Sequence, residues 1–288
     1  MQKVPSKARK VAEHPWFVIL ASVSSIAGFF WYLHDRVAQY PPVLSGLYFT
    51  ISLLVLLAGI FYSLKVRSEN VALRDIASTF NEINHIYRDS LKDMFGGNNP
   101  VDNPEDLLVE EERVLRSVCQ RIENIFVRVT NRNCMVTIKL LLKETDGRYF
   151  AHTYVRSLEN CPRDKPERRK YQVGTGANTT FDKALQKCPN GIPSHFFSPD
   201  LTREEGYCNE RQHYDKIYRS AIVVPIRGVN KGKEGTNEEY DMIGFLCVDT
   251  KSTHRLNDGY HLQMVSSLAG QMYNFMSLMR GKYTVFVG

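Results

Sequence analysis

Two long apolar segments near the start of the chain constrain its fold more than any other feature. They read WFVILASVSSIAGFFWYL at 16–33 and VLSGLYFTISLLVLLAGIFYSL at 43–64, and neither contains Asp, Glu, Lys, Arg or His. At a rise of ~1.5 Å per residue, a helix of either length is long enough to cross the ~30 Å hydrocarbon core of a bilayer. The sequence therefore predicts a hairpin of two transmembrane helices over 16–64, and a lipid bilayer as a partner.

Basic residues flank this hairpin on its outer sides. A basic tail at 1–15 precedes it and Lys65, Arg67 and Arg74 follow it, whereas the connection HDRVAQYPP contains only Arg36. Lysine and arginine collect on the cytoplasmic side of membrane helices. We therefore expect a multi-pass protein of the cell inner membrane with both termini in the cytoplasm, which senses a cytosolic signal.

A helix without proline or glycine is predicted directly after the second apolar segment, over 65–95. Its apolar residues form a nearly heptad seam, which consists of Leu73, Ile76, Phe80, Ile83, Tyr87, Leu91 and Met94. Such a seam is typical of a coiled coil. We favour a parallel stalk that makes the protein a homodimer or a higher homo-oligomer. The alternative is a helix that packs on its own domain. GGNNPVDNP at 96–104 then forms a linker.

The next segments alternate between helix and strand signals. Asn103 as the N-cap and Pro104 at the first helical position predict a helix that ends near Val127. Met135–Lys143 alternates apolar and polar residues, which predicts a strand with one solvated side. Tyr149–Arg156 returns as a second strand after an Asp-Gly turn.

A predicted hairpin lies at 220–249. Two nearly continuous apolar runs, Ala221–Ile226 and Met242–Val248, flank a polar segment that is rich in glycine. Apolar residues on both parities indicate strands that are covered on both faces, as in the centre of a sandwiched sheet. A long helix follows, with an apolar stripe made of Leu262, Val265, Ala269, Met272, Met276 and Met279.

The order of these motifs resembles the GAF domain family. The resemblance rests on YRSAIVVPI at 218–226, MIGFLCVDT at 242–250, GTGANTTFDKAL at 174–185 and HFFSPDL at 195–201. It covers 105–281, and a short tail at 282–288 follows. It implies an α+β fold, in which two transmembrane helices and a helical stalk precede a cytosolic GAF-like antiparallel sheet flanked by helices. It also implies that the first and last helices of the domain pack at a dimer interface.

The resemblance further implies a small-molecule cavity. Matched by position, its lining residues are Thr175, Asn178, Thr180, Phe197, Asp200, Arg219 and Ser220, with Tyr207 and Tyr214 as candidates for stacking on the ligand. Independently, the glycine-containing turn at 174–180 leaves backbone N–H groups and two hydroxyls at a helix N-terminus, which suits an anion. The alternative is that Asn178 or Thr179 caps this helix. No catalytic residue, metal ligand or cofactor is predicted.

Composition excludes some classes of protein and leaves others open. The net charge of +6 is spread along the chain, which does not favour nucleic acid as a partner. The six cysteines include no CxxC pair, which indicates reduced thiols. Cys161, Cys188 and Cys208 lie in segments expected near the cavity, but their spacing with His195 and His213 is irregular for zinc.

Three hypotheses for the function follow. The first is a membrane-anchored GAF-like sensor and effector for a small anionic cytosolic ligand of the nucleotide type, for example a cyclic nucleotide. It would transmit the signal to its transmembrane helices or a partner, and disruption of the membrane in antiviral defence is one output that this architecture suggests. The Asn-Lys pair of the cyclic-nucleotide phosphodiesterase subgroup is replaced here by Asp249-Thr250-Lys251, which argues against that subgroup's way of binding.

The other two hypotheses belong to different classes. One is a non-catalytic membrane scaffold whose GAF-like domain binds protein. A cavity filled by large side chains of the helix at 180–188 would favour it. The other is an enzyme similar to the GAF-fold reductases of free methionine sulfoxide, which use reactive pocket cysteines. It would require a thiolate of low pKa and a resolving partner among Cys161, Cys188 and Cys208.

Overall fold

The computed structural model describes residues 28, 32, 41–96, 101, 103–158, 170–186, 194–229 and 240–287. The chain divides into two compact units, Met1–Asn70 and Val71–Gly288. The predicted basic tail at 1–15 and the predicted helix at 16–33 lie outside the described residues, except for Gly28 and Tyr32.

The second predicted membrane segment lies in helix α3 (Pro42–Phe95), which continues without a break into the second unit. Its section Thr50–Arg67 has a mean hydropathy of 1.6 and is not buried at all. By length and composition it is the one section of the described chain that is able to cross a membrane. Uncharged apolar residues explain this exposure, because they need no protein partner when lipid surrounds them.

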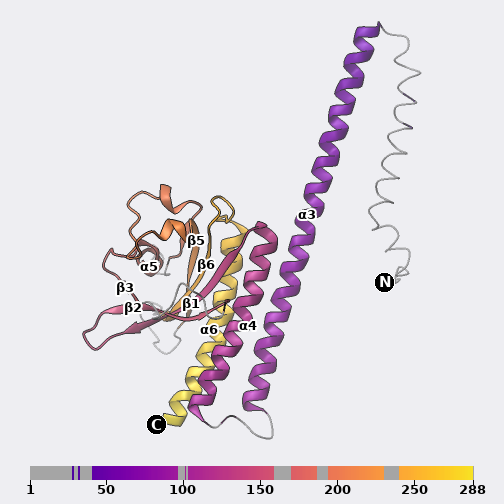
Figure 1. Ribbon diagram of the computed structural model, residues 1–288. Coiled ribbons are helices and arrows are strands. Elements are labelled where there is room, and N and C mark those ends of the chain that lie inside the picture. Colours follow the sequence, from indigo (N-terminus) through magenta and orange to yellow (C-terminus); the bar gives the residue numbers. More distant parts are fainter. Residues whose placement is uncertain are drawn as a thin grey trace, which may run out of the picture. The chain divides into compact units, whose positions relative to one another are not determined.

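The second unit is built on a sheet of six strands in the order β3-β2-β1-β6-β5-β4, and every neighbouring pair is antiparallel (Figure 1). The strands are β1 (Cys134–Lys143), β2 (Tyr149–Arg156), β3 (Lys170–Val173), β4 (Phe196–Ser198), β5 (Ser220–Val229) and β6 (Tyr240–Thr250). The predicted hairpin is confirmed, because β5 and β6 pair from Ser220 opposite Thr250 to Val229 opposite Tyr240.

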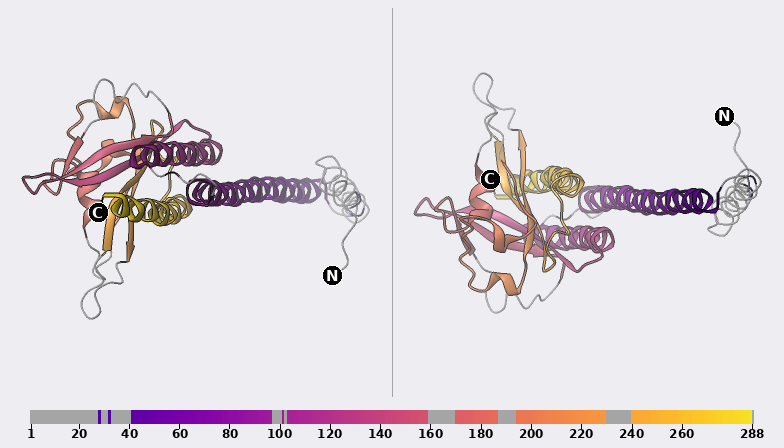
Figure 2. Two further views of the ribbon diagram at one scale, coloured as in Figure 1. Left: turned by 90° about the horizontal axis from the view of Figure 1, so that it is seen from below. Right: turned by 90° about the horizontal axis from the view of Figure 1, so that it is seen from above.

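Helices α4 (Pro104–Thr130) and α6 (Tyr260–Val287) lie side by side on one face of this sheet (Figure 2). The helix α4 begins as the sequence predicts, because the Oδ1 of Asn103 accepts a hydrogen bond from the N–H of Glu105 at 3.0 Å. Apolar side chains of both helices join those of β1, β5 and β6 in one buried core. The apolar stripe of α6 therefore serves the core of its own domain.

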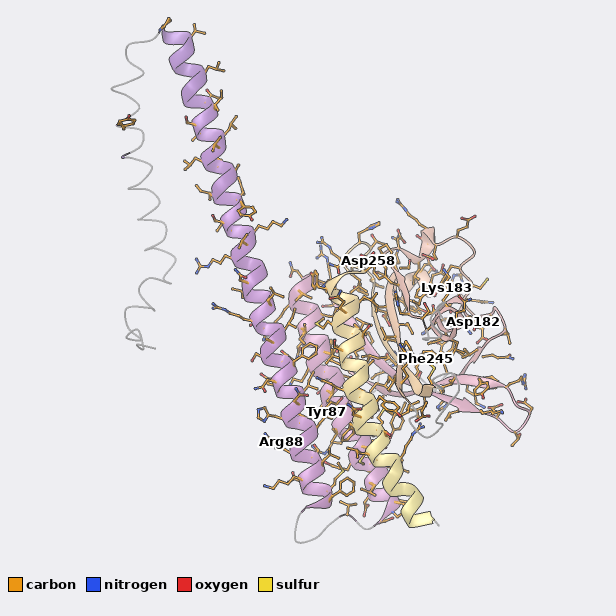
Figure 3. All side chains as sticks on the ribbon, turned by 180° about the vertical axis from the view of Figure 1, so that it is seen from behind. Tyr87, Arg88, Asp182, Lys183, Phe245 and Asp258 are labelled. Carbon is orange, nitrogen blue, oxygen red and sulfur yellow. The ribbon has the colours of Figure 1, made fainter. Side chains whose placement is uncertain are left out.

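The section of α3 from Val71 onward packs on α4 and α6, on the side away from the sheet (Figures 1 and 2). Ile83, Tyr87 and Met94 are buried there, and the ring of Tyr87 stacks on Phe275 with 4.8 Å between centroids. Figure 3 shows Tyr87 on the packed side of α3 and Arg88 on the open side. Most of the predicted coiled-coil seam is thus used within one chain, which is the alternative that the sequence left open and not the preferred stalk.

The other face of the sheet is covered by helix α5 (Thr179–Leu185) and by the loop at 199–219. The ring of Phe181 packs on Phe245 of β6 with 5.0 Å between centroids. Because of this cover, Thr137 and Lys139 are only 2% and 6% exposed, so the predicted solvated side of β1 is wrong at both positions. The antiparallel sheet with flanking helices fits the GAF-like α+β fold.

A buried histidine lies at the start of α6. The Nδ1 of His261 accepts from the N–H of Asn257 at 3.1 Å, and the Oδ1 of Asn257 accepts from the N–H of His261 at 3.3 Å. The ring is 1% exposed and lies 5.4 Å from the ring of Phe126. Burial lowers the pKa of His261 from 6.5 to about 4, because a buried imidazolium loses its hydration.

We expect this histidine to make the domain less stable in mild acid. The pKa of His261 is depressed in the folded state, so its contribution is complete above pH 6.5 and is lost as the pH falls toward about 4. In that window the free energy of unfolding should fall by up to about 1.4 kcal/mol per pH unit. Denaturant unfolding at several pH values measures the slope. His261→Gln retains an acceptor without the titration, and an equally steep slope in this variant would contradict the prediction.

Candidate functional site

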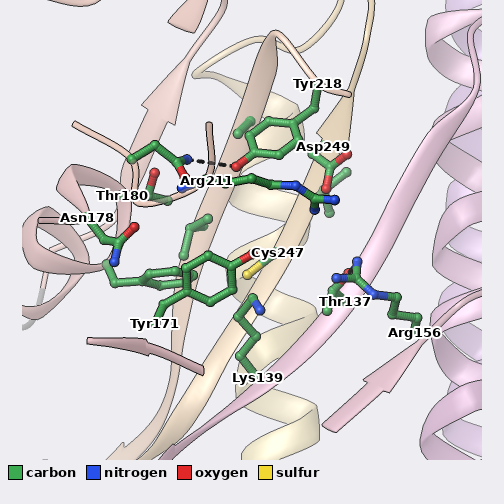
Figure 4. Close-up of a pocket in the computed structure, with 15 residues that line it drawn as sticks. Thr137, Lys139, Arg156, Tyr171, Asn178, Thr180, Arg211, Tyr218, Cys247 and Asp249 are labelled. Carbon is green, nitrogen blue, oxygen red and sulfur yellow. Dashed lines mark hydrogen bonds between the residues drawn. The ribbon is translucent and has the colours of Figure 1, made fainter. Parts of the chain in front are cut away.

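A cavity of about 60 Å³ lies between the sheet and its cover of α5 and the loop at 199–219 (Figure 4). This volume holds about four water molecules, or an anion with a similar number of non-hydrogen atoms. The strands contribute Thr137, Lys139, Arg156, Tyr171, Ala221, Val223, Cys247, Val248 and Asp249, and the cover contributes Asn178, Thr180, Phe181, Asn209, Arg211 and Tyr218.

Strand register brings two buried cations to this face of the sheet. Lys139 lies opposite Thr153 on β2, and its Nζ donates to the Oγ1 of Thr153 at 2.6 Å. Arg156 lies opposite Thr137, and its guanidinium donates to the Oγ1 of Thr137 at 2.7 Å. Cross-strand pairing of this kind fixes long side chains that would otherwise move freely.

A bulge in the pairing of β1 and β2 makes this arrangement possible. The register shifts between Ile138 and Lys139, so that Tyr154 is the extra residue of β2. Side chains of a regular strand alternate between faces, and Thr153 and Arg156 would then point to opposite sides. With the extra residue both meet the cavity side of β1, while Val155 packs into the helical core.

The charges on the cavity wall favour a negatively charged ligand. Among the described lining residues, Lys139, Arg156 and Arg211 are cationic and Asp249 is the one carboxylate. Lys139 also lies over the ring of Tyr171, with 4.3 Å from its Nζ to the ring centroid. Cations in a poorly hydrated cavity attract anions more strongly than the same cations in water. The site is therefore suited to a small anion that displaces water.

The cavity also contains one thiol among the described residues that line it. Burial raises the pKa of Cys247 to about 12. The charges of Lys139 and Arg156 act in the opposite direction, and that of Asp249 acts in the same direction as burial. Because the thiolate is the nucleophile, a protonated thiol is poorly suited to redox chemistry.

Residues of the cover are fastened to one another by hydrogen bonds. Asn178 is 2% exposed, its Nδ2 donates to the backbone oxygen of Gln172 at 3.1 Å, and its Oδ1 accepts from the N–H of Glu210 at 3.3 Å. The hydroxyls of Thr180 and Tyr207 lie 3.1 Å apart. These contacts join α5 to the loop at 199–219, so the two form one continuous wall.

The residues predicted from the sequence fall into two groups. Asn178 and Thr180 line the cavity, and Tyr207 and Tyr214 pack beside that wall with 5.1 Å between ring centroids. The other five are not among the lining residues. Thr175 is exposed on the turn before α5, Phe197 packs against the helical core, Asp200 pairs with Arg219 at 3.3 Å, and Ser220 donates to the backbone oxygen of Ser198.

The predicted anion site at 174–180 is occupied by an acid of the chain itself. The N–H groups of Gly174 and Gly176 donate to the two carboxylate oxygens of Asp182, at 2.6 and 2.7 Å. Asn178 is the N-cap residue of α5, but its side chain makes no capping hydrogen bond. The turn therefore binds a carboxylate from within α5.

Several residues that bear on metal or thiol chemistry lie away from the cavity. Cys161 and Cys188 fall outside the described residues. Cys208, His195 and His213 are exposed. Within the described ranges, no group of three or more His, Cys, Asp or Glu residues is placed to hold a metal ion.

Comparison with known proteins gives similarity only at the level of solved structures. No protein-family model and no curated protein matches the sequence. The chain is similar to type II free methionine-R-sulfoxide reductase from Thermoplasma acidophilum, at 15% identity and a TM-score of 0.40 over 60% of this chain and 97% of that chain.

Two GAF domains of phosphoenolpyruvate-protein phosphotransferases are also similar. The one from Acinetobacter has 14% identity and a TM-score of 0.38, over 63% of this chain and 97% of that chain. The one from Coxiella burnetii has 11% identity and a TM-score of 0.40, over 70% of this chain and 96% of that chain. At these identities and scores the similarity carries no argument about ligand or activity.

Proposed function

We propose that this protein is a membrane-anchored sensor that binds a small anion in the cavity between the sheet and the loop at 199–219. The observation that carries the proposal is the wall of that cavity, in which three cations face one carboxylate. The apolar section Thr50–Arg67 supports the anchor. The basic flanks support an orientation with both termini in the cytoplasm of an inner-membrane protein.

The size of the cavity favours a ligand smaller than a nucleotide. Pockets for drug-sized ligands usually enclose roughly 300–1,000 Å³, whereas this cavity encloses about 60 Å³. A cyclic nucleotide would enter only if the loop at 199–219 moved away from the sheet. Output through the membrane helices, a homo-oligomer or membrane disruption in antiviral defence belongs to this proposal as its downstream part.

Binding of a small anion is tested by thermal unfolding of the full chain in detergent micelles. We expect acetate, propionate or phosphate, at one hundred times its dissociation constant, to stabilise the folded state by about 2.7 kcal/mol, which is a shift of several degrees. Chloride at the same ionic strength controls for screening. Cyclic mono- and dinucleotides and free methionine sulfoxide complete the panel. If no compound shifts the midpoint beyond chloride, the sensor proposal is wrong.

A protein-binding scaffold is the second candidate, and one observation favours it. Phe181 of α5 packs down onto Phe245 and Tyr171, with centroid distances of 5.0 and 5.8 Å, and fills much of the space that a ligand would need. A panel without any shift would therefore support the scaffold. The reductase hypothesis finds less support, because within the described residues the cavity offers only the protonated thiol of Cys247.

A further inference from the structure

Arg211 differs from the other two cations of the cavity. Lys139 and Arg156 each donate a hydrogen bond to a threonine of the neighbouring strand. No hydrogen bond or ion pair joins the guanidinium of Arg211 to any residue in the described part of the chain, although its side chain lines the cavity. Figure 4 shows this side chain pointing toward Asp249, which already has an interaction within the protein. A guanidinium has five N–H donors, and here they are available to a ligand.

The backbone that carries Arg211 is held firmly. The N–H of Arg211 donates to the Oδ1 of Asn209 at 2.9 Å. The Nδ2 of Asn209 donates in turn to the hydroxyls of Tyr207 and Tyr218, at 2.9 and 2.8 Å. Next to it, the N–H of Glu210 donates to Asn178. The position of residue 211 is therefore fixed before any ligand binds, which lowers the entropy lost on binding.

The rest of the wall limits the kind of anion. The rings of Tyr171 and Phe181 and the side chains of Ala221 and Val223 form an apolar part of the lining. This part favours a ligand with a few carbon atoms over an inorganic ion, because apolar surface is better covered by apolar atoms than by water. A guanidinium matches a carboxylate through two parallel hydrogen bonds.

We propose that Arg211 determines the specificity of the cavity by binding the carboxylate of a small organic acid in a bidentate pair. This inference rests on the proposed function, since it names the ligand class of the same site. Lys139 and Arg156 supply positive potential from the sheet, and Arg211 supplies the directed contact from the loop. The bound acid then joins the loop at 199–219 to the sheet.

The test measures binding of acetate and propionate to the full chain in detergent micelles by titration calorimetry, with phosphate as the inorganic comparison. Arg211→Gln should weaken carboxylate binding by about 10- to 100-fold. Arg211→Lys retains the charge without the fork and should also bind more weakly than the wild type. Arg203→Gln removes the same charge from the same loop at a position outside the lining, and should bind as the wild type does.

Each outcome supports or overturns one of the two proposals. The midpoint of unfolding without ligand should be the same in Arg211→Gln and the wild type, because the guanidinium has no partner in the described structure. A lower midpoint would assign Arg211 a structural role and overturn the inference. Equal carboxylate binding by both proteins, or tighter binding of phosphate than of either acid by the wild type, would overturn the inference and leave the sensor standing. Failure of the wild type to bind any anion would overturn the sensor itself.

Discussion

Gly244→Ala should leave the domain unfolded or destabilised by more than about 4 kcal/mol, a large effect for a single methyl group. Gly244 lies opposite Leu140 where β6 pairs with β1. A Cβ atom at this position would lie 2.0 Å from the backbone oxygen of Lys139 and 2.9 Å from its carbonyl carbon. The contact cannot be relieved by rotating a side chain, so the central strands would have to separate. The same shift would displace Lys139 from the cavity wall.

Circular dichroism and denaturant unfolding of the full chain measure this loss. Gly270→Ala is the matched control, because no atom lies within 4 Å of the added Cβ and the position is inside α6. Alanine is preferred to glycine within a helix by up to about 1 kcal/mol, so the control should be slightly more stable than the wild type. If Gly244→Ala unfolds at the same denaturant concentration as the wild type, the close pairing of β1 and β6 is not as described.

Ile83→Ala should reduce the free energy of unfolding by about 2–5 kcal/mol, as for other fully buried aliphatic residues. Ile83 is 0% exposed at the contact of α3 with α4 and α6. The loss combines the transfer of fewer apolar atoms from water with the cavity that remains. Two ion pairs at the surface of the same contact, Arg121 with Glu82 and Arg128 with Asp75, contribute much less, because exposed pairs are screened by water.

The control for Ile83 is its neighbour in the sequence. Asn84 is exposed, so Asn84→Ala should change the free energy of unfolding by less than about 0.5 kcal/mol. Protein concentration is the second variable. A seam packed within one chain gives a midpoint that does not depend on concentration, whereas a seam shared between copies gives a midpoint that rises with it. A rising midpoint would restore the stalk that the sequence favoured.

Much of the fold could be predicted because its signals are local. The apolar runs of β5 and β6 indicate a two-sided cover without knowledge of the partner, and the Asn103 cap fixes the start of α4 by itself. The docking of α3 was harder to predict. A heptad-like seam shows that one side of a helix needs an apolar partner, but Ile83 and Tyr87 fit helices of the same chain as well as a second copy.

The cavity was predicted less well, because its charged wall depends on contacts between distant segments. Lys139 alternates with apolar residues, which in a single strand indicates a solvated face. Its burial depends on α5 and the loop at 199–219, and the position of Arg156 depends on a bulge that no local pattern announces. The two-sided cover of β6 was the one available signal, since a strand paired with it is expected to be covered on both faces too.

The contact of Asp182 with Gly174 and Gly176 affects how selective the domain is. The carboxylate is tethered only six and eight residues from its donors, so it acts as a competitor whose effective concentration at the turn is at least in the ~mM range. A phosphate-bearing metabolite at lower concentration cannot displace it without much stronger contacts of its own. The chain thereby protects this turn from abundant cellular phosphates, and leaves the cavity behind Arg211 as the entry for negative charge.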